Sequence, residues 1–302
     1  ETSDIQKVEN LLDGFLQSKR QNGRVALNLP LEYIKDGITV KGYIIGDNEY
    51  KELSETILDV YNTITLLKET RVTIEFDDES NNSLKLKLFS CVYAELEEDN
   101  YCFIISDGNI YQVTKSYLEK VNQFYSSIDI AKIPELKRWH GEPEGKFNAC
   151  CDSKTILVMD KVLIHPEGSG KFEFCDLLTY SKQIIHAKIY DGASQPLGHL
   201  FNQGLVSVMG ITDEDIRSEI QSQIYKQQRD CEKSMDFSIG NPFKASDYTI
   251  VFLILCRNGD AIVEQRPQIP FLAKSIFREN VTKIQSMGFK VEILGIGIEN
   301  RE

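Results

Sequence analysis

The sequence predicts an α/β protein, α+β overall, in which an N-terminal α+β module precedes a domain with the element order αβββαβ. Helical stripes and short strands alternate in the first half, whereas three consecutive strands and then a strand–helix–strand unit occupy the second. The segment between them, residues 128–145, mixes proline, glycine and charge without periodicity. We therefore expect two domains, residues 1–128 and 129–302.

The first half is predicted to combine helices with a β-meander. Apolar residues recur at helical spacing over 8–15 and 53–64, and a helix over 115–127 closes the module. Turn residues Asp107 and Gly108 separate two strands of the meander. The expected strands are 24–29, 38–45, 72–76, 84–96, 101–106 and 109–113.

The second half has clear helix boundaries and one strongly apolar strand. Ser194 can cap a helix that has Pro196 in its first turn, and Thr212 with Asp215 has capping-box spacing for the next helix. The run YTIVFLILC, 248–256, is typical of a central strand covered on both faces. In order, we expect a helix at 145–151, strands at 155–164, 171–179 and 183–190, a helix at 195–209, a helix after Thr212, a strand at 248–256, a helix at 273–287 and a strand at 290–298. The first three strands should be antiparallel, and all five should form one mixed sheet covered by helices.

This αβββαβ order resembles the core of the restriction-endonuclease-like nucleases, which share the loose motif PD-(D/E)XK. Their chemistry uses a carboxylate on the second strand, and a metal-binding group and a lysine two residues apart on the third. Here Asp176 lies on the second strand, and His186 and Lys188 lie two residues apart on the third. The resemblance implies that Asp176 binds a divalent cation and that Lys188 orients the attacking water or stabilises the developing charge.

His186 stands where these nucleases normally carry a carboxylate. Imidazole is a poorer ligand than carboxylate for Mg²⁺, so a site made of Asp176 and His186 should bind Mg²⁺ weakly or prefer Mn²⁺. Glu173 is the candidate replacement carboxylate, although in a regular strand it would point away from Asp176 unless a bulge intervened. The alternative is a plain cross-strand ion pair between Asp176 and Lys188, worth at most about 1 kcal/mol.

Any contact with nucleic acid should be local, because the formal net charge is -12 and the pI is about 5.0. The acidic surplus is concentrated in 76–80 and 95–99 of the first half. On the helix over 195–209, His199 and Gln203 share a face that either lines the cleft or is simply solvated. The candidate nucleic-acid-binding residues are His199, Gln203, Lys171, Lys182 and Arg266, with Lys161 and Lys188 completing a basic rim.

Composition disfavours three classes of protein: disulfide-bonded, zinc-dependent and membrane-spanning proteins. Seven cysteines without CxxC spacing are expected to be reduced thiols, and four histidines without an HExxH pattern disfavour a zinc protease. No apolar run approaches the roughly 18 residues of a membrane span, and no signal peptide opens the chain. We therefore expect a cytoplasmic protein without membrane contact.

The block from Lys161 to Gly204, which contains EFCDLL, IHAK and HLFNQG, resembles the signature of a sporadically distributed bacterial family of unknown function. The resemblance covers about 140–297. One departure is Ala149, where members tend to carry a glutamate on the short helix before the three strands.

The patchy distribution of this family is similar to that of restriction and phage-defence genes carried on mobile islands. By this association, the resemblance implies a nucleic-acid-directed protein of a bacterial anti-phage defence or restriction system. It is expected to be a metal-dependent DNA endonuclease using Mg²⁺ or Mn²⁺, with DNA and proteins of the same operon as partners. The sequence is compatible with a homo-oligomer. Two alternatives stay open: a catalytically inactive DNA-binding, sensor or scaffold subunit, and an enzyme unrelated to nucleic acid.

Overall fold

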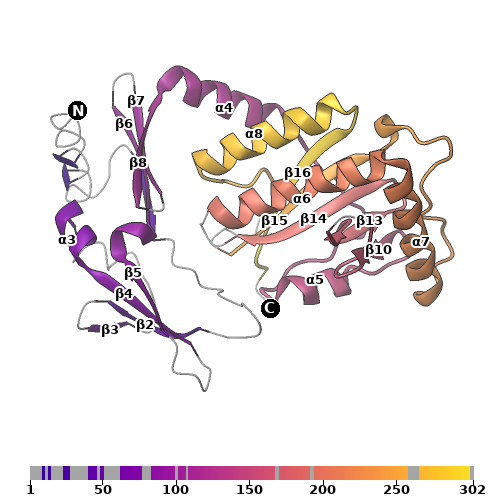
Figure 1. Ribbon diagram of the computed structural model, residues 1–302, viewed down its shortest axis with the longest axis horizontal. Coiled ribbons are helices and arrows are strands. Elements are labelled where there is room, and N and C mark those ends of the chain that lie inside the picture. The colour runs from indigo at the N-terminus through magenta and orange to yellow at the C-terminus, as the bar shows by residue number, and fades with distance from the viewer. Residues whose placement is uncertain are drawn as a thin grey trace. The chain divides into compact units, whose positions relative to one another are not determined.

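The chain forms two compact units, Glu1–Lys120 and Val121–Glu302. The computed structural model describes residues 9–10, 13–14, 23–27, 40–45, 48–50, 62–76, 83–98, 101–106, 108–166, 170–190, 194–257 and 265–299 (Figure 1). The division between the units falls inside helix α4, Lys115–Ser127, whereas the sequence places the boundary just after this helix.

The N-terminal unit contains two four-stranded antiparallel sheets. Their orders are β1-β6-β7-β8 and β3-β2-β4-β5. The strands are β1 Gly23–Leu27, β2 Val40–Ile45, β3 Asn48–Tyr50, β4 Arg71–Phe76, β5 Ser83–Lys87, β6 Val92–Glu98, β7 Tyr101–Ser106 and β8 Asn109–Thr114, with helix α3 at Ile64–Glu69 and the 3₁₀ turn η1 at Leu88–Cys91.

Strands β6, β7 and β8 form the predicted meander, and Gly108 adopts φ +73° in its turn, a conformation that favours glycine. The single strand predicted over 84–96 is wrong, because η1 divides it into β5 and β6, which belong to different sheets. The predicted helix over 53–64 falls mostly outside the described residues. So does much of the one over 8–15, and parts of the acidic segments 76–80 and 95–99.

A six-stranded mixed sheet is the centre of the C-terminal unit. Its order is β10-β13-β14-β15-β16-β9; β10, β13 and β14 are antiparallel, whereas β14, β15, β16 and β9 run parallel. The strands are β9 Asp129–Ile130, β10 Ile156–Val158, β13 Leu177–Thr179, β14 Gln183–Tyr190, β15 Thr249–Cys256 and β16 Lys290–Gly297. This confirms the expected mixed sheet and adds β9, a strand within the segment predicted to be irregular.

Two of the predicted strands are each interrupted. Residues 155–164 form β10 and β11, Leu163–Ile164, and residues 171–179 form β12, Phe172–Glu173, and β13. β11 and β12 pair with each other as a separate two-stranded sheet. The first interruption is a turn in which Lys161 adopts φ +62°, and it directs the chain out of the main sheet.

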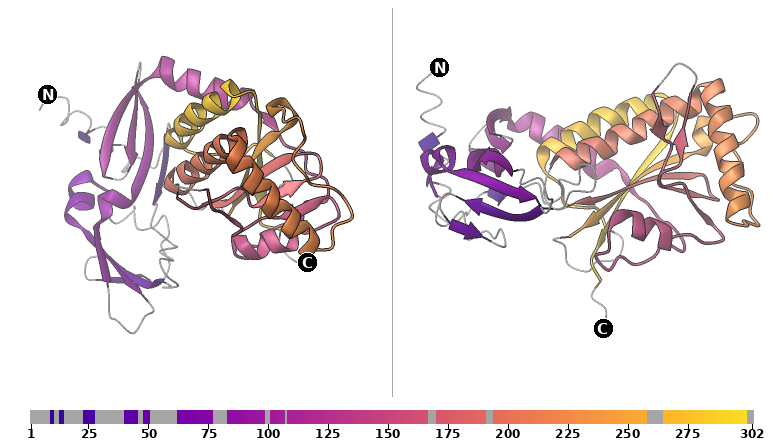
Figure 2. Two further views of the ribbon diagram at one scale, coloured as in Figure 1. Left: turned by 45° about the vertical axis from the view of Figure 1, so that its right-hand side comes forward. Right: turned by 60° about the horizontal axis from the view of Figure 1, so that its bottom comes forward.

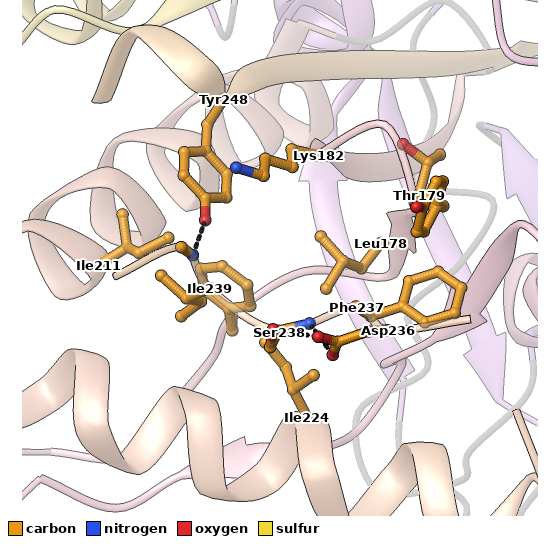
Figure 3. A pocket seen from close by; sticks show the side chains of 13 residues that line it. Leu178, Thr179, Lys182, Ile211, Ile224, Asp236, Phe237, Ser238, Ile239 and Tyr248 are labelled. Atoms are coloured by element: carbon orange, nitrogen blue, oxygen red, sulfur yellow. Dashed lines mark hydrogen bonds between the residues drawn. The ribbon is translucent and has the colours of Figure 1, made fainter. Parts of the chain in front are cut away.

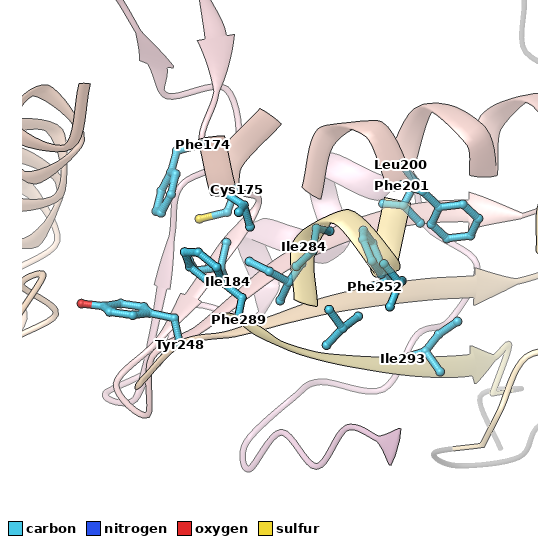
Figure 4. Packing of buried hydrophobic residues seen from close by; sticks show 14 of the residues in the cluster. Phe174, Cys175, Ile184, Leu200, Phe201, Tyr248, Phe252, Ile284, Phe289 and Ile293 are labelled. Carbon is cyan, nitrogen blue, oxygen red and sulfur yellow. The ribbon is translucent and has the colours of Figure 1, made fainter. Parts of the chain in front are cut away.

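Helices cover both faces of this sheet. α6, Ser194–Thr212, and α8, Phe271–Ser286, lie side by side on one face, and the short helix α5, Glu144–Cys150, lies on the other (Figure 2). Under α6 and α8, the rings of Phe201, Phe252 and Phe277 meet edge to face at centroid distances of 5.0 to 5.7 Å. Figure 4 shows Phe201 of α6 and Phe252 of β15 in this core. Trp139 and Phe147 are buried in the core on the α5 side.

The long crossover between β14 and β15 also contains α7, Glu214–Asp230. Its N-cap is Asp213, whose carboxylate accepts hydrogen bonds from the backbone N–H groups of Asp215 and Ile216. The predicted capping role of Thr212 is therefore wrong, because its hydroxyl donates to the Val208 carbonyl inside α6. α6 itself starts at Ser194.

The seven cysteines, all of them described by the structure, form no disulfide, and four of them are buried. Among the residues that the structure describes, none of the helices combines the length and the apolar character that crossing a lipid bilayer requires.

Candidate functional site

Asp176 lies where β13 and β14 separate. Its backbone N–H still donates to the Ile185 carbonyl at 3.0 Å, as in a regular ladder. The next N–H of β14 on this edge, that of Ala187, donates instead to Oδ2 of Asp176 at 2.8 Å. The side chain thus replaces the strand partner, and this contact holds the carboxylate at the point where the ladder ends.

Three carboxylates meet at this point. One oxygen atom from each of Asp160, Glu173 and Asp176 lies within 4.8 Å of the other two. Asp160 follows β10, Glu173 ends β12 and Asp176 precedes β13. We call these three side chains the carboxylate cluster.

The position of Glu173 depends on the break between β12 and β13. In an uninterrupted strand, residues three apart face opposite sides of the sheet. Because residues 174–176 belong to neither strand, the carboxylates of Glu173 and Asp176 come together. The break between β12 and β13 therefore brings Glu173 to the same side as Asp176, which the sequence-based prediction expected a β-bulge to do.

Helix α5 contributes two further polar side chains. Glu144, in its first turn, accepts a hydrogen bond from the Ile189 backbone N–H at 3.1 Å and forms an ion pair with Lys188, whose Nζ lies 3.3 Å from Oε2. Asn148, one turn later, is fully buried, and its Nδ2 lies 3.5 Å from Oδ1 of Asp176. The Oδ1 atom of Asn148 has no hydrogen-bond partner among the described residues.

Burial and like charges dominate the electrostatics of the carboxylate cluster. The pKa of Asp176 is raised from its ordinary value of 3.8 to about 7, first by burial and then by the charges of Glu144, Asp160 and Glu173. The pKa of Glu173 is also raised, by burial and by Asp160 and Glu144, although nearby lysines oppose this effect. Such a cluster attracts either protons or a cation.

His186 does not belong to the carboxylate cluster. It is buried against Phe252, with 6.4 Å between the ring centroids, and its Nε2 has no hydrogen-bond partner among the described residues. Burial lowers the pKa of this imidazole to about 3, so it is neutral at physiological pH. Its predicted role as a metal ligand finds no support in this arrangement.

The predicted nucleic-acid-binding residues are dispersed. On α6, His199 is exposed and Gln203 is half-buried, and Lys171 is exposed just before β12. Lys182 lies before the first residue of β14, whereas Lys188 lies near its far end. Arg266 donates hydrogen bonds to the carbonyls of Tyr125 and Ile128 and lies over the Tyr125 ring, which are structural contacts.

Of the predicted site residues, Asp176 and Glu173 lie in the carboxylate cluster and Lys188 pairs with Glu144 of α5. Asp160, Glu144 and Asn148 were not predicted from the sequence. A usable signal existed for Glu144, which is an acidic residue in the first turn of the helix before the three strands. Asp160 gave none, since its position follows from the turn after β10. Ala149, where a family glutamate was expected, is exposed on α5, whereas Glu144 and Asn148 of the same helix contact the site.

Comparison with known proteins gives one match. A family model with the description "Family of unknown function (DUF6119)" matches residues 1–297, which includes the N-terminal half. Searches of curated proteins and of solved structures found no match.

Proposed function

Because the chain belongs to DUF6119, a family of unknown function, we propose its function from the chemistry of the site: divalent-metal-dependent hydrolysis of phosphodiester bonds in nucleic acid. The observation that carries this proposal is the carboxylate cluster with Lys188 beside it, at the point where two antiparallel strands separate. The strand order β10-β13-β14-β15, with β15 parallel to β14, agrees with the restriction-endonuclease-like resemblance. On the same resemblance, we place the protein in a bacterial anti-phage defence or restriction system.

The donor set fits Mg²⁺ or Mn²⁺. Both ions prefer oxygen ligands. Oxygen atoms that share one ion at about 2.1 Å lie at most about 4.2 Å apart, so carboxylates within 4.8 Å of one another need only a small side-chain adjustment to bind the same ion. The Oδ1 of buried Asn148, which has no hydrogen-bond partner in the described part of the chain, is a further oxygen beside Asp176. When bound, the ion would polarise a phosphate oxygen and lower the pKa of a bound water.

The protein side chains have separate tasks in this proposal. Asp160, Glu173 and Asp176 hold the ion, and Asn148 and the Ala187 N–H fix the orientation of Asp176. Lys188, whose side chain is 33% exposed, can reach a phosphate at the rim and stabilise the charge that develops on it. Glu144 keeps the Lys188 ammonium group at the site.

The second candidate function is a nuclease-like subunit that binds DNA without cutting it, as a sensor or scaffold. Two observations favour it: His186 is buried where related motifs have a carboxylate, and the chain has a net charge of -12. The two functions share the fold and differ in whether a bound cation is needed.

The test measures Mn²⁺ and Mg²⁺ binding by calorimetry and the cleavage of single-stranded DNA, duplex DNA and RNA by the full chain. Asp176→Asn should weaken ion binding at least tenfold and abolish cleavage, whereas Lys188→Ala should abolish cleavage but retain the ion. Lys226→Ala, at an exposed position of α7, is the charge-matched control. DNA binding without cleavage under either metal would replace our proposal with the sensor function, and a chain that binds neither ion would refute it. Cells expressing wild type or Asp176→Asn and challenged with phage would test the defence role.

A further inference from the structure

A second candidate site lies at the other end of β14. A cavity of about 370 Å³ is enclosed by the β13–β14 turn, the start of β15 and residues 236–240, with α7 on one side (Figure 3). Its inner wall is apolar, with Leu178, Ile211 and Ile224. Cavities of this volume are in the range that binds small organic molecules.

One wall of the cavity carries a cation held in place by a strained turn. Lys182 adopts φ +64° in the β13–β14 turn, where its N–H donates to Thr179 and its carbonyl accepts from Thr249. Glycine or asparagine would satisfy this turn with less strain, so the backbone gives no reason for a lysine here. Its Nζ lies 5.2 Å from the centroid of the Tyr248 ring and 3.5 Å from Asp247 in a partly exposed ion pair.

An aromatic wall and a carboxylate complete the lining. Tyr180 is 50% exposed and packs edge to face on the buried ring of Phe237, with 6.4 Å between centroids. Asp236 accepts hydrogen bonds from the backbone N–H and the hydroxyl of Ser238, which hold the pKa of Asp236 below its ordinary value. Figure 3 shows Lys182 and Asp236 on opposite sides of the cavity.

This distribution of groups restricts the ligand. It must offer a flat aromatic surface to Tyr180, an anionic group to Lys182 and N–H donors to Asp236, with the last two at opposite ends. A free amino acid carries its ammonium and carboxylate on one carbon atom and cannot span the cavity in this way. A nucleotide separates its phosphate from the N–H edge of its base, and carboxylates accept hydrogen bonds from exocyclic amines of bases.

We propose that this cavity binds a nucleotide, with the phosphate at Lys182, the base against Tyr180 and an N–H edge of the base at Asp236. The ligand is either a free mononucleotide or the phosphorylated end of a nucleic-acid strand, which present the same chemistry. The inference stands on the cavity alone and does not rest on the proposed hydrolysis at the carboxylate cluster.

The test is a calorimetric titration of the full chain with AMP, GMP, CMP and UMP, with the matching nucleosides and with inorganic phosphate. Lys182→Gly is the key variant, because glycine accepts the φ of this turn and the protein should fold at least as well. It should weaken binding of the preferred mononucleotide at least tenfold and leave binding of its nucleoside unchanged. Tyr180→Ala should weaken both, and the exposed Lys226→Ala controls for the lost charge.

A 5′-phosphorylated tetranucleotide distinguishes the two sources. If it binds at least as tightly as the mononucleotide and Lys182→Gly weakens it equally, the ligand is a strand end; mononucleotide binding alone assigns a free nucleotide. The proposal is overturned if no nucleotide or tetranucleotide binds saturably at millimolar concentration, or if Lys182→Gly binds them as tightly as wild type.

Discussion

Replacing His186 by leucine should make the C-terminal unit less sensitive to acid. The imidazole is buried beside Phe252, and burial lowers its pKa from 6.5 to about 3. The folded state therefore resists protonation that the unfolded chain accepts. Protonation of His186 in the unfolded chain therefore lowers the free energy of unfolding. The stability of the unit is unaffected by protonation of this residue above pH 6.5 and falls progressively as the pH decreases from 6.5 toward 3. Leucine has a similar volume and cannot be protonated, so the variant lacks this loss.

The size of the effect follows from the two pKa values. At pH 7.5 the unfolded imidazole is largely neutral, and protonation contributes almost nothing to the free energy of unfolding. At pH 5.0 the unfolded state gains about 2 kcal/mol from binding a proton that the folded state does not bind. The Nε2 atom of His186 is buried without a hydrogen-bond partner in the segments that the structure describes, so its removal should add about 1 kcal/mol of stability at both pH values.

The assay is urea unfolding at pH 7.5 and 5.0, followed by the fluorescence of Trp139. This is the chain's single tryptophan and is buried in the C-terminal unit, so its emission reports this unit. The measured quantity is the difference in the free energy of unfolding between His186→Leu and wild type, in which the titration of the carboxylates common to both proteins cancels. This difference should be about 2 kcal/mol larger in favour of the variant at pH 5.0 than at pH 7.5. His199→Leu, at an exposed position, is the matched control.

Two outcomes would contradict this reasoning. An equal difference at both pH values would mean that His186 is not shielded from protons. Loss of Mn²⁺ binding in His186→Leu would restore the imidazole to the metal site predicted from the sequence.

Three further predictions concern the packing of the C-terminal unit, each measured by urea unfolding. Gly204→Ala should cost about 1–3 kcal/mol, since the added Cβ would lie 2.6 Å from the Phe252 ring; an unchanged midpoint would show that α6 can move away. Arg266→Met should lower the free energy of unfolding by about 2 kcal/mol, because the hydrogen bonds to backbone carbonyls such as that of Ile128 are lost, and it should leave DNA affinity unchanged. Weaker DNA binding at equal stability would instead support the nucleic-acid-binding role predicted from the sequence. Asp213→Ala should cost about 1 kcal/mol and Thr212→Val less, and the reverse order would contradict the observed cap.

The sequence predicted the C-terminal sheet well because its pattern is set by burial. A run such as β15, in which nearly every side chain is buried, has few alternatives to a central strand. β9 was missed because two residues carry no periodicity, and the breaks within the first two predicted strands were missed because turns interrupt otherwise continuous apolar patterns.

The part of the candidate site that lies on or next to adjacent strands could be predicted from the sequence, because strand spacing is a local pattern. Asp176 and Lys188 are placed by adjacent strands, whose spacing in the sequence can be read directly. Asn148 and Glu144 reach the site from a helix 28 and 44 residues away in sequence from their respective partners, Asp176 and Lys188. The first-turn position of Glu144 could be read from the sequence, but its contact with Lys188 depends on how α5 packs on the sheet, which local sequence patterns do not encode.

The short strand β9 has a consequence for solubility. β16 is the last long strand of the sheet, and its free edge would expose unpaired peptide groups beside an apolar face, as aggregating chains require. β9 pairs with Glu292 and Ile293, and the backbone of Gln265 exchanges two hydrogen bonds with Gly295 further along the same edge. Two brief segments thus close the edge against intermolecular pairing. A C-terminal fragment that began after Ile130 would keep every element of the candidate site and would still be prone to form fibres or precipitate.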